Sequence, residues 1–349
     1  MSANTKTILI LGGSYGGVAI AHYILKHVIP SLPNKDDYRV GLVSSSSHFF
    51  CRPTCPRVLP SENALPKDKL FVPLTKAFEQ YTNPAVTLYH GTVVKLDHSA
   101  CTASILSFPD TVETNIGYYA LTVATGATAA SPLLGLFGDH HETEKAWTSF
   151  RKLLHREKSV EEVTSIETGY ELAGTYASDQ TLERVADAVT IRLDNGQTLH
   201  ADLYIPAIGV LPNTNFLDRD LLDKDGYVKV DSSSLRVENA GPRVYALGHV
   251  CSSKPQAIHA IMGQAPVIGE NLKQDLLAAD RGDVADKIIY RAYKPDARVS
   301  QLVVIGKKGV GLAFGWKISS FLVWLIKGRD YWLGMTPPMW NGKQFAKPI

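Results

Sequence analysis

Reactive side chains gather in segment 51–57, which reads C-R-P-T-C-P-R. Cys55 lies between Arg52 and Arg57 in this segment, and neighbouring positive charge stabilises a thiolate over a thiol. A thiolate at Cys55 could exchange electrons with a redox cofactor. The two cysteines have C-x3-C spacing, however, which is neither the C-x-x-C of thiol redox sites nor a zinc pattern. The sequence therefore favours a buried, inert Cys55 thiol and keeps a redox-active one as the alternative.

A glycine-rich turn at residues 12–17 (G-G-S-Y-G-G) could hold a phosphate group. An apolar β run precedes it and a helix-like run follows, which is the setting that a dinucleotide-binding loop needs. Gly12 permits a tight turn, and Gly17 lets the helix pack closely on the strand. Gly13 and Ser14 let backbone N–H groups approach a pyrophosphate at the helix N-terminus. Ser14 stands where the G-x-G-x-x-G pattern has its second glycine, and it is small enough to keep this approach open.

The strand expected over residues 38–43 ends at Ser44. An acidic residue normally occupies this place and hydrogen-bonds the ribose hydroxyls of the dinucleotide. Because a serine hydroxyl is a weaker partner, Ser44 is a candidate contact but most of the nucleotide affinity must come from elsewhere. Residues 44–47 are all serine, which predicts a small and mobile loop.

Three later segments extend this pattern: the apolar strand 119–126 ending in A-T-G, the strand 203–209 followed by L-P-N-T, and segment 243–250, R-V-Y-A-L-G-H-V. In this order they resemble the pyridine-nucleotide-disulfide oxidoreductase superfamily, and most of all its apoptosis-inducing-factor-like, mitochondria-associated flavoproteins. The resemblance covers residues 5–135 and 188 to about 335. It implies an FAD-dependent enzyme of the α/β class. The FAD-binding domain would be Rossmann-like, with a parallel sheet plus a β-meander or hairpin, and discontinuous in sequence.

The resemblance also assigns roles to single residues. The glycine turn would hold the FAD pyrophosphate, and the redox cysteine of related disulfide reductases falls at about the place of Cys55. His48 lies where the family has a substrate-facing loop. The remaining cofactor contacts implied by the family are Arg57 beside the adenosine, Val94 or its neighbour Val93 at the adenine, Thr125 and Gly126 over the cofactor, and Gly248 with His249 at the ribityl chain.

His249 departs from the family, which reads G-D where this chain reads G-H. The family aspartate accepts a hydrogen bond from a ribityl hydroxyl, whereas histidine can donate, accept or carry charge. His249 is therefore expected to contact the cofactor or, as the alternative, to act as an acid or base on the substrate. Covalent attachment of the flavin is a third option.

A larger departure concerns the NAD(P)H-binding domain, which the family inserts between the A-T-G strand and a hairpin. Alternation around N-G at residues 195–196 marks that hairpin at 189–202. The segment left for the inserted domain is shorter than a dinucleotide half-domain, which needs more than one βαβ unit. Its T-G-Y-E-L-A-G stretch resembles the family's second fingerprint helix without the preceding glycines. The predicted organisation is FAD-binding domain, first half, at 1–150; a degenerate NAD-domain remnant at 151–188; FAD-binding domain, second half, at 189–275; and a small α+β region at 276–349.

The C-terminal third predicts a helix over 257–278 and strands over 299–305 and 310–314. Segment 318–326 is apolar on all sides, which favours a buried helix. The alternative is a hydrophobic surface for peripheral membrane contact or a lipophilic substrate. A face uncovered by the loss of one domain could also be covered by a second copy in a homodimer.

Composition limits the remaining possibilities. A formal net charge of +2 without basic clusters predicts no nucleic-acid partner. Neither a signal peptide nor an uncharged apolar run of about 18 residues is present, so a cytoplasmic protein is expected, with peripheral membrane contact left open. No metal pattern is apparent among the four cysteines.

The function predicted from these features is an FAD-dependent oxidoreductase or oxidase that acts on a small hydrophobic or aromatic metabolite without its own NAD(P)H domain. Such a chain would suit secondary metabolism. Two alternatives remain open: an NAD(P)H:quinone oxidoreductase at a membrane surface, and a redox-neutral or non-catalytic flavin-binding protein.

Overall fold

The computed structural model describes residues 5–81, 85–129, 131–133, 135, 138–156, 186–192, 198–204, 210–282, 288–296, 301–305, 308–313 and 315–348. Its centre is a seven-stranded sheet in the order β13-β8-β1-β2-β5-β6-β7. Strands β13, β8, β1, β2 and the first part of β5 are parallel, whereas β5, β6 and β7 form an antiparallel meander. This arrangement confirms the predicted Rossmann-like sheet with a β-meander. The strands are β1 (Lys6–Leu11), β2 (Tyr38–Ser44), β5 (Val86–Asp97), β6 (Thr102–Ser107), β7 (Glu113–Gly117), β8 (Ala120–Val123) and β13 (Val244–Ala246).

Strand β1 shows why the sheet buries both faces. Successive side chains of a strand point to opposite faces, so a strand between two layers must be apolar throughout. Ile8 and Ile10 belong to one core cluster, and Leu9 and Leu11 belong to another on the opposite face. All four side chains are fully buried. The continuous apolar run in the sequence is thus the signature of a central strand.

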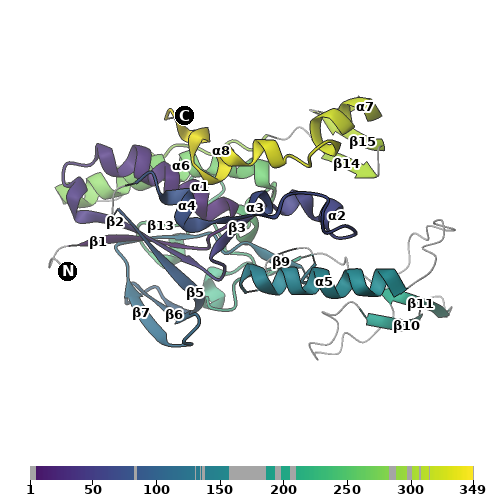
Figure 1. Cartoon of the computed structure of the whole chain (residues 1–349). Coiled ribbons are helices and arrows are strands. Elements are labelled where there is room, and N and C mark those ends of the chain that lie inside the picture. The colour runs from purple at the N-terminus through teal and green to yellow at the C-terminus, as the bar shows by residue number, and fades with distance from the viewer. Residues whose placement is uncertain are drawn as a thin grey trace.

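Helices α1 (Tyr15–Tyr23) and α6 (Ile258–Arg281) lie together on one face of this sheet, as Figure 1 shows. Tyr23 packs so closely on Gly269 that a Cβ at Gly269 would overlap the tyrosine ring. Helix α6 confirms the helix predicted from the apolar spacing. Helix α8 (Pro337–Trp340) lies over α1, and the smaller helices and strands near the sheet edge are α2 (Cys55–Val58), α3 (Lys67–Leu70), α4 (Leu74–Phe78), β3 (His48–Phe50) and β4 (Phe71–Pro73).

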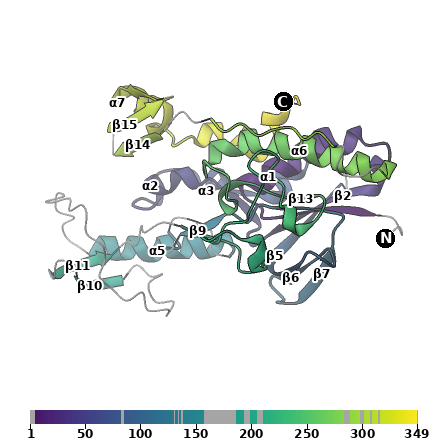
Figure 2. The same ribbon diagram turned by 180° about the vertical axis from the view of Figure 1, so that it is seen from behind.

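Helix α5 (His140–Arg156) extends away from the sheet, and the hairpin of β10 (Ala186–Arg192) and β11 (Thr198–Tyr204) lies near its far end in both views (Figures 1 and 2). This hairpin confirms the one predicted around N-G, although the turn itself lies outside the described residues. Residues 205–209 of the predicted strand 203–209 also lie outside the described residues. Residues 203 and 204 are the last two residues of β11. Segment 157–185, with the T-G-Y-E-L-A-G stretch, also lies outside. The expected domain limits after residues 150 and 275 fall inside α5 and α6.

The C-terminal region forms a small sheet of β14 (Gln301–Ile305), β15 (Lys308–Ala313) and β16 (Trp316–Ile318), followed by α7 (Ser320–Val323) and a π-helical turn, η10 (Trp324–Gly328). The two predicted strands are confirmed over their described residues. The prediction of a buried helix over 318–326 is wrong, because Phe321 is 65% exposed and Leu322, Leu325 and Ile326 are each more than 40% exposed. Only Val323 of this group is fully buried, since no other layer of the described chain covers the opposite side.

The chain after this small sheet returns to α1. His22 Nε2 lies 2.8 Å from the Trp340 carbonyl oxygen, and His22 Nδ1 lies 2.7 Å from the Tyr81 hydroxyl. Lys26 Nζ donates to the Gly342 carbonyl at 2.7 Å, and the buried Phe345 packs edge-on against Tyr23. These contacts fasten the C-terminus to the first helix. Among the described residues, no helix has both the length and the apolar character that crossing a bilayer requires.

Candidate flavin site

Two glycines of the turn between β1 and α1, Gly12 and Gly17, could not be replaced without displacing backbone. Gly12 has φ +118°, and a Cβ there would overlap the carbonyl oxygen of Ala124. A Cβ at Gly17 would overlap the carbonyl oxygen of Gly12. The two roles predicted for these residues, the tight turn and the close packing of helix on strand, therefore match the geometry. Gly16, by contrast, has room for a methyl group at ordinary contact distance.

The N-terminus of α1 is open to an anion. Ser14 is the N-cap residue and makes no side-chain capping bond, and the first turn carries no acidic residue. The first backbone N–H groups of a helix lack intrahelical partners and carry partial positive charge. The glycine cradle and this helix end together fit the pyrophosphate of FAD, with Gly12, Gly13, Ser14 and Gly17 as the residues that would hold it.

Ser44 lies at the end of β2, directly against Gly13, where a Cβ on Gly13 would overlap the serine side chain. Its hydroxyl donates to the Ser46 carbonyl at 2.6 Å and accepts from the Ser46 N–H at 3.3 Å. These bonds shape the serine loop. Ser44 is 8% exposed, so it borders the pyrophosphate cradle mainly as a small, packed residue.

Hydrogen bonds join Thr125 and Gly126 to the loop that follows β12 (Val210–Pro212). The Thr125 hydroxyl donates to the Asn213 carbonyl at 2.7 Å, and Asn213 Nδ2 donates to the Thr125 carbonyl at 2.9 Å. Strand β9 (Ala127–Ala129) pairs with β12 beside these bonds. Gly126 has φ +69° and faces open space, since a Cβ there would meet nothing within 4 Å. Thr125 and Asn213 are 88 residues apart in the chain. The A-T-G and L-P-N motifs thus form one hydrogen-bonded unit just beyond the C-terminal end of β8.

Gly248 follows β13 and begins the single-turn helix η8 (Gly248–Val250) with φ +77°. Its N–H donates to Gln264 Oε1 at 2.9 Å, which ties it to α6. His249 is half-buried, and burial together with the positive charge of Arg52 lowers its pKa. A neutral His249 can accept a proton or a hydrogen bond, as both the cofactor-contact and the acid–base hypotheses require. The structure brings Arg52, rather than Arg57, near to it.

The segment 51–57, which carries Cys51 and Cys55, packs into an apolar cluster. Cys51 and Cys55 are buried free thiols within a cluster that includes Phe50, Phe71 and Trp147. Burial raises the pKa of Cys55 to about 12, although Arg52 opposes this shift. A thiol with this pKa is protonated at neutral pH and is a poor nucleophile. The geometry therefore favours the inert thiol over the redox-active one.

Cys51 Sγ lies 3.1 Å from the Thr336 hydroxyl, so the C-terminal segment closes over segment 51–57. Arg57 is exposed, and its guanidinium lies over the Tyr331 ring at 5.8 Å from the centroid. Val94 is 42% exposed on β5, in the part of the strand that pairs with the meander, whereas its neighbour Val93 is buried. The assignments of Arg57 and Val94 to the adenosine half of FAD stay predictions.

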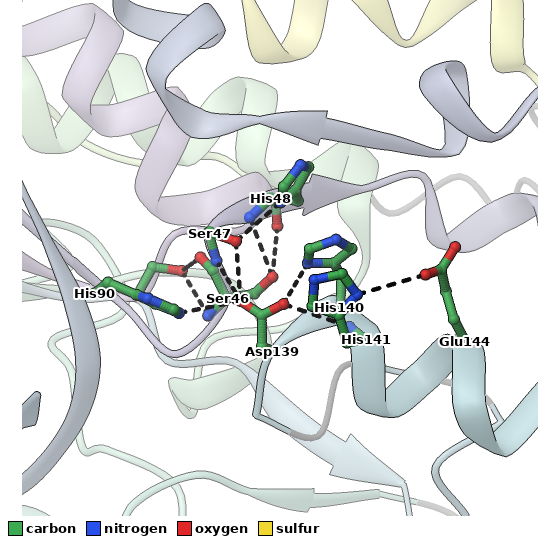
Figure 3. A network of polar contacts seen from close by, with 9 residues as sticks. Ser46, Ser47, His48, His90, Asp139, His140, His141 and Glu144 are labelled. Atoms are coloured by element: carbon green, nitrogen blue, oxygen red, sulfur yellow. Dashed lines mark hydrogen bonds and ion pairs between the residues drawn. The ribbon is translucent and has the colours of Figure 1, made fainter. Parts of the chain in front are cut away.

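His48 belongs to a cluster of imidazoles around Asp139, shown in Figure 3. Its ring lies 3.8 Å from that of His140 between centroids, and its Nδ1 lies 2.9 Å from the Ser47 hydroxyl. Burial and the neighbouring His140 lower the pKa of His48. His90 Nε2 lies 3.0 Å from Asp139 Oδ2.

Asp139 anchors the serine loop. Its Oδ2 accepts hydrogen bonds from the Ser47 N–H at 3.1 Å and the Ser47 hydroxyl at 2.9 Å. Although burial opposes ionisation, these bonds hold the pKa of Asp139 well below its usual range. Sequence reasoning identified His48 but missed Asp139, His90 and His140, the other members of this cluster. The D-H-H run at 139–141, at the start of the amphipathic helix α5, was the available signal.

Comparisons with known proteins agree with this geometry. The profile of the family described as pyridine nucleotide-disulphide oxidoreductase matches residues 164–265. The oxidoreductase phnG of Penicillium herquei is 36% identical, over 99% of this chain and 100% of that protein. The FAD-dependent oxidoreductase FVFD30 of Flammulina velutipes is 30% identical over 44% of this chain and 47% of its own length.

Among solved structures, NDH2 from Plasmodium falciparum has the same fold, with a TM-score of 0.61 and 13% identity over 99% of each chain. The α/β architecture, the glycine cradle and the full-length match to phnG lead to one assignment. The chain belongs to the pyridine nucleotide-disulphide oxidoreductase family and is an FAD-dependent oxidoreductase.

Proposed function

We propose that this flavoenzyme oxidises a small hydrophobic or aromatic metabolite, in secondary metabolism, without an NAD(P)H-binding domain of its own. It would be a member of the apoptosis-inducing-factor-like branch in which that domain has shrunk to a remnant. When bound, FAD supplies two-electron chemistry at its ring system. The protein residues then have to hold the cofactor, shape the substrate site and move protons.

The observation that carries this proposal is the short connection between β9 and β10. Strand β9 ends at Ala129 and β10 begins at Ala186, and α5 occupies His140–Arg156 of that interval. Residues 157–185 are therefore all that could form a nucleotide-binding unit before the hairpin. A single βαβ unit takes about 30 residues or more, and a dinucleotide half-domain contains more than one strand–helix–strand repeat. The family profile begins to match at residue 164, within this interval, which supports its descent from such a domain.

The residues near Gly248 support a role for His249 in this chemistry. Its lowered pKa, with Arg52 as the second cause, makes it neutral at pH 7. A neutral imidazole could accept a proton from a substrate hydroxyl or hydrogen-bond the cofactor. Replacing His249 with Asp, the residue usual in the family, would separate these roles: FAD content would be kept in both cases, but turnover would fall only if His249 acts on the substrate.

The experiment that tests the proposal is the anaerobic addition of NADH and then NADPH to the purified holoprotein, followed by visible spectroscopy. The oxidised flavin band is expected to persist with both nucleotides and to bleach with dithionite. The dithionite step is the control that shows that the bound flavin can be reduced. Rapid bleaching by either nucleotide would contradict the proposal. Oxygen consumption with candidate hydrophobic or aromatic substrates would then identify the reductant.

A second candidate function, an NAD(P)H:quinone oxidoreductase at a membrane surface, is favoured by the exposed apolar side chains of the C-terminal region. Trp316 is 79% exposed and Phe321 65%, and exposed Lys308, Lys317 and Arg329 lie near them in the sequence. Apolar side chains beside basic residues suit an anionic lipid surface. This candidate predicts that the wild-type protein sediments with anionic vesicles and that Phe321→Ser weakens this binding. Ile289→Ser, at a residue that is 91% exposed and precedes β14, is the matched control.

A further inference from the structure

The end of β2 borders the pyrophosphate cradle without an acidic side chain. Ser44, the last residue of β2, packs on Gly13, and the Gly12 N–H donates to the Val43 carbonyl at 2.8 Å. In dinucleotide-binding folds an acidic residue at this place hydrogen-bonds the ribose. Residues 44–47, the serine loop, carry no charge. The nucleotide end of the FAD site therefore lacks its usual carboxylate at the end of β2.

A carboxylate reaches the serine loop from a distant part of the chain. Asp139 is 92 residues from Ser47, yet its Oδ2 accepts hydrogen bonds from the Ser47 N–H at 3.1 Å and the Ser47 hydroxyl at 2.9 Å. The same oxygen lies 3.0 Å from His90 Nε2, and His90 is the register partner of Ser44 in the pairing of β5 with β2. Figure 3 shows Asp139 beside Ser47 and His90. Asp139 thus supplies, at the end of β2, a negative charge that the strand itself does not carry.

Asp139 is the charged anchor of a loop whose internal bonds are neutral. The Ser44 hydroxyl donates to the Ser46 carbonyl at 2.6 Å, and the Ser46 hydroxyl donates to the His48 carbonyl at 3.1 Å. Ser47 instead binds an ionised group: although burial opposes ionisation, the bonds from Ser47 hold the pKa of Asp139 well below its usual range. Hydrogen bonds to an ionised acceptor are about twice as strong as neutral ones. Loss of the charge should therefore loosen the serine loop.

We propose that Asp139 is a positioning residue for FAD, which fixes the serine loop in the shape that receives the adenosine half of the cofactor. Asp139 acts through Ser47 and does not touch the cofactor, because both of its oxygens already face protein groups. Oδ2 is engaged by Ser47, and Oδ1 accepts from the His141 N–H at 3.3 Å and contacts His140. The inference rests on the FAD-binding assignment and is independent of the substrate and of the loss of the NAD(P)H domain.

The test compares Asp139→Asn with the wild-type holoprotein, because this substitution keeps the shape of the side chain and removes its charge. Equilibrium dialysis gives the Kd for FAD. Displacement of bound FAD by ADP gives the affinity for a ligand that has the adenosine and the diphosphate but no flavin ring. Both affinities should fall by about 10-fold, the effect of losing one hydrogen bond to a charged group. The visible absorption band of the FAD that remains bound should match the wild type, because the ring end of the site is unchanged.

Glu142→Gln is the matched control. Glu142 is an exposed acid in the first turn of α5, so this variant removes the same charge from the same end of the helix. Its side chain makes no hydrogen bond to the serine loop in the part of the chain that the structure describes. Glu142→Gln should leave the affinities for FAD and ADP unchanged.

Ser47→Ala tests whether Asp139 acts through the loop. It removes the hydroxyl donor and keeps the backbone N–H, so the affinities for FAD and ADP should each fall by about 3-fold. In the double variant Asp139→Asn/Ser47→Ala the two effects should be less than additive, since both substitutions weaken the same contact. Far-UV circular dichroism checks folding, and if Asp139→Asn does not fold, the ADP affinity of Ser47→Ala decides the question.

An unchanged ADP affinity in Asp139→Asn or in Ser47→Ala would overturn the proposal, whether or not the flavin band shifts. An equal loss in Glu142→Gln would show a general effect of charge, and strictly additive losses in the double variant would show that Asp139 does not act through Ser47. Either result also overturns it. None of these readouts uses NAD(P)H or a substrate, so a failure here is distinguishable from a failure of the proposed function.

Discussion

The β1–α1 unit and the segment of β14 to η10 are both rich in apolar residues, yet they fold in opposite ways. The side chains of Ile8, Leu9, Ile10 and Leu11 are fully buried. In the C-terminal segment, Val310 is 75% exposed and Phe321 65%, and Val323 alone is fully enclosed within α7. The first unit lies between two layers of the same domain. The second has a layer on one side only.

The difference teaches that hydrophobicity predicts burial only where the chain provides two covering layers. A central strand of a parallel sheet meets helices or loops on both faces. A small three-stranded sheet with one short helix has too little surface to bury its own outer side chains. Larger exposed apolar patches on proteins mark interaction sites.

The largest expected effect is on the first unit. In Gly17→Ala the new methyl group would overlap the Gly12 carbonyl oxygen, so backbone must move. We expect a loss of about 4 kcal/mol or more in the free energy of unfolding, with loss of bound FAD. Denaturant unfolding and the ratio of flavin to protein absorbance measure both. Gly16→Ala is the control, since its methyl group would make only ordinary contacts at 3.6 Å. Equal damage in both variants would show that the close approach at Gly17 is unimportant.

An intermediate effect is expected where the C-terminus rejoins the first unit. Burial lowers the pKa of His22 from 6.5 to about 4, although its hydrogen bond with Trp340 opposes this shift. Between these two pH values the unfolded chain binds a proton that the folded chain does not. Stability is therefore full above about pH 6.5 and is lost as the pH falls toward 4, by about 3 kcal/mol in total.

The measurement is the urea midpoint of the wild-type protein at pH 7, 5.5 and 4. His22→Gln lowers stability at pH 7 because it disturbs the bonds to Tyr81 and Trp340. It should also remove this part of the pH dependence. If the variant and the wild type lose stability in parallel, then His22 is not the group responsible.

The smallest effects distinguish the two sides of α7. Val323 is fully buried against Gly309 and Gly311, so Val323→Ala should lower the free energy of unfolding by about 2 kcal/mol. Phe321→Ser should change it by no more than about 0.5 kcal/mol, because Phe321 is mostly exposed. Thermal unfolding of both variants checks the difference. A large loss in Phe321→Ser would indicate that another surface covers this residue in solution, such as a second copy of the chain.

The glycine turn was predictable in detail because its constraint is local. The φ of Gly12 and the contact of Gly17 with Gly12 arise within six residues of chain, and the sequence pattern records them directly. The hairpin of β10 and β11 and helix α6 were predictable for a similar reason, since periodicity and turn residues are properties of neighbouring positions. The arrangement of segment 51–57 was less accessible. Both arginines flank Cys55 in sequence, but only the fold shows that Arg52 reaches His249 and Cys55 while Arg57 lies on Tyr331.

The sequence by itself determined the glycine cradle, because that turn depends on residue types at short spacing. It indicated the family through the resemblance of several separated motifs. The tertiary structure alone decided which groups meet. Asp139 lies far along the chain from Ser47, and Thr336 from Cys51, yet each pair is in hydrogen-bonding contact. It also decided which apolar side chains stay exposed. Contacts between distant segments and the presence of a covering layer depend on the packing of the whole chain, and no local pattern encodes them.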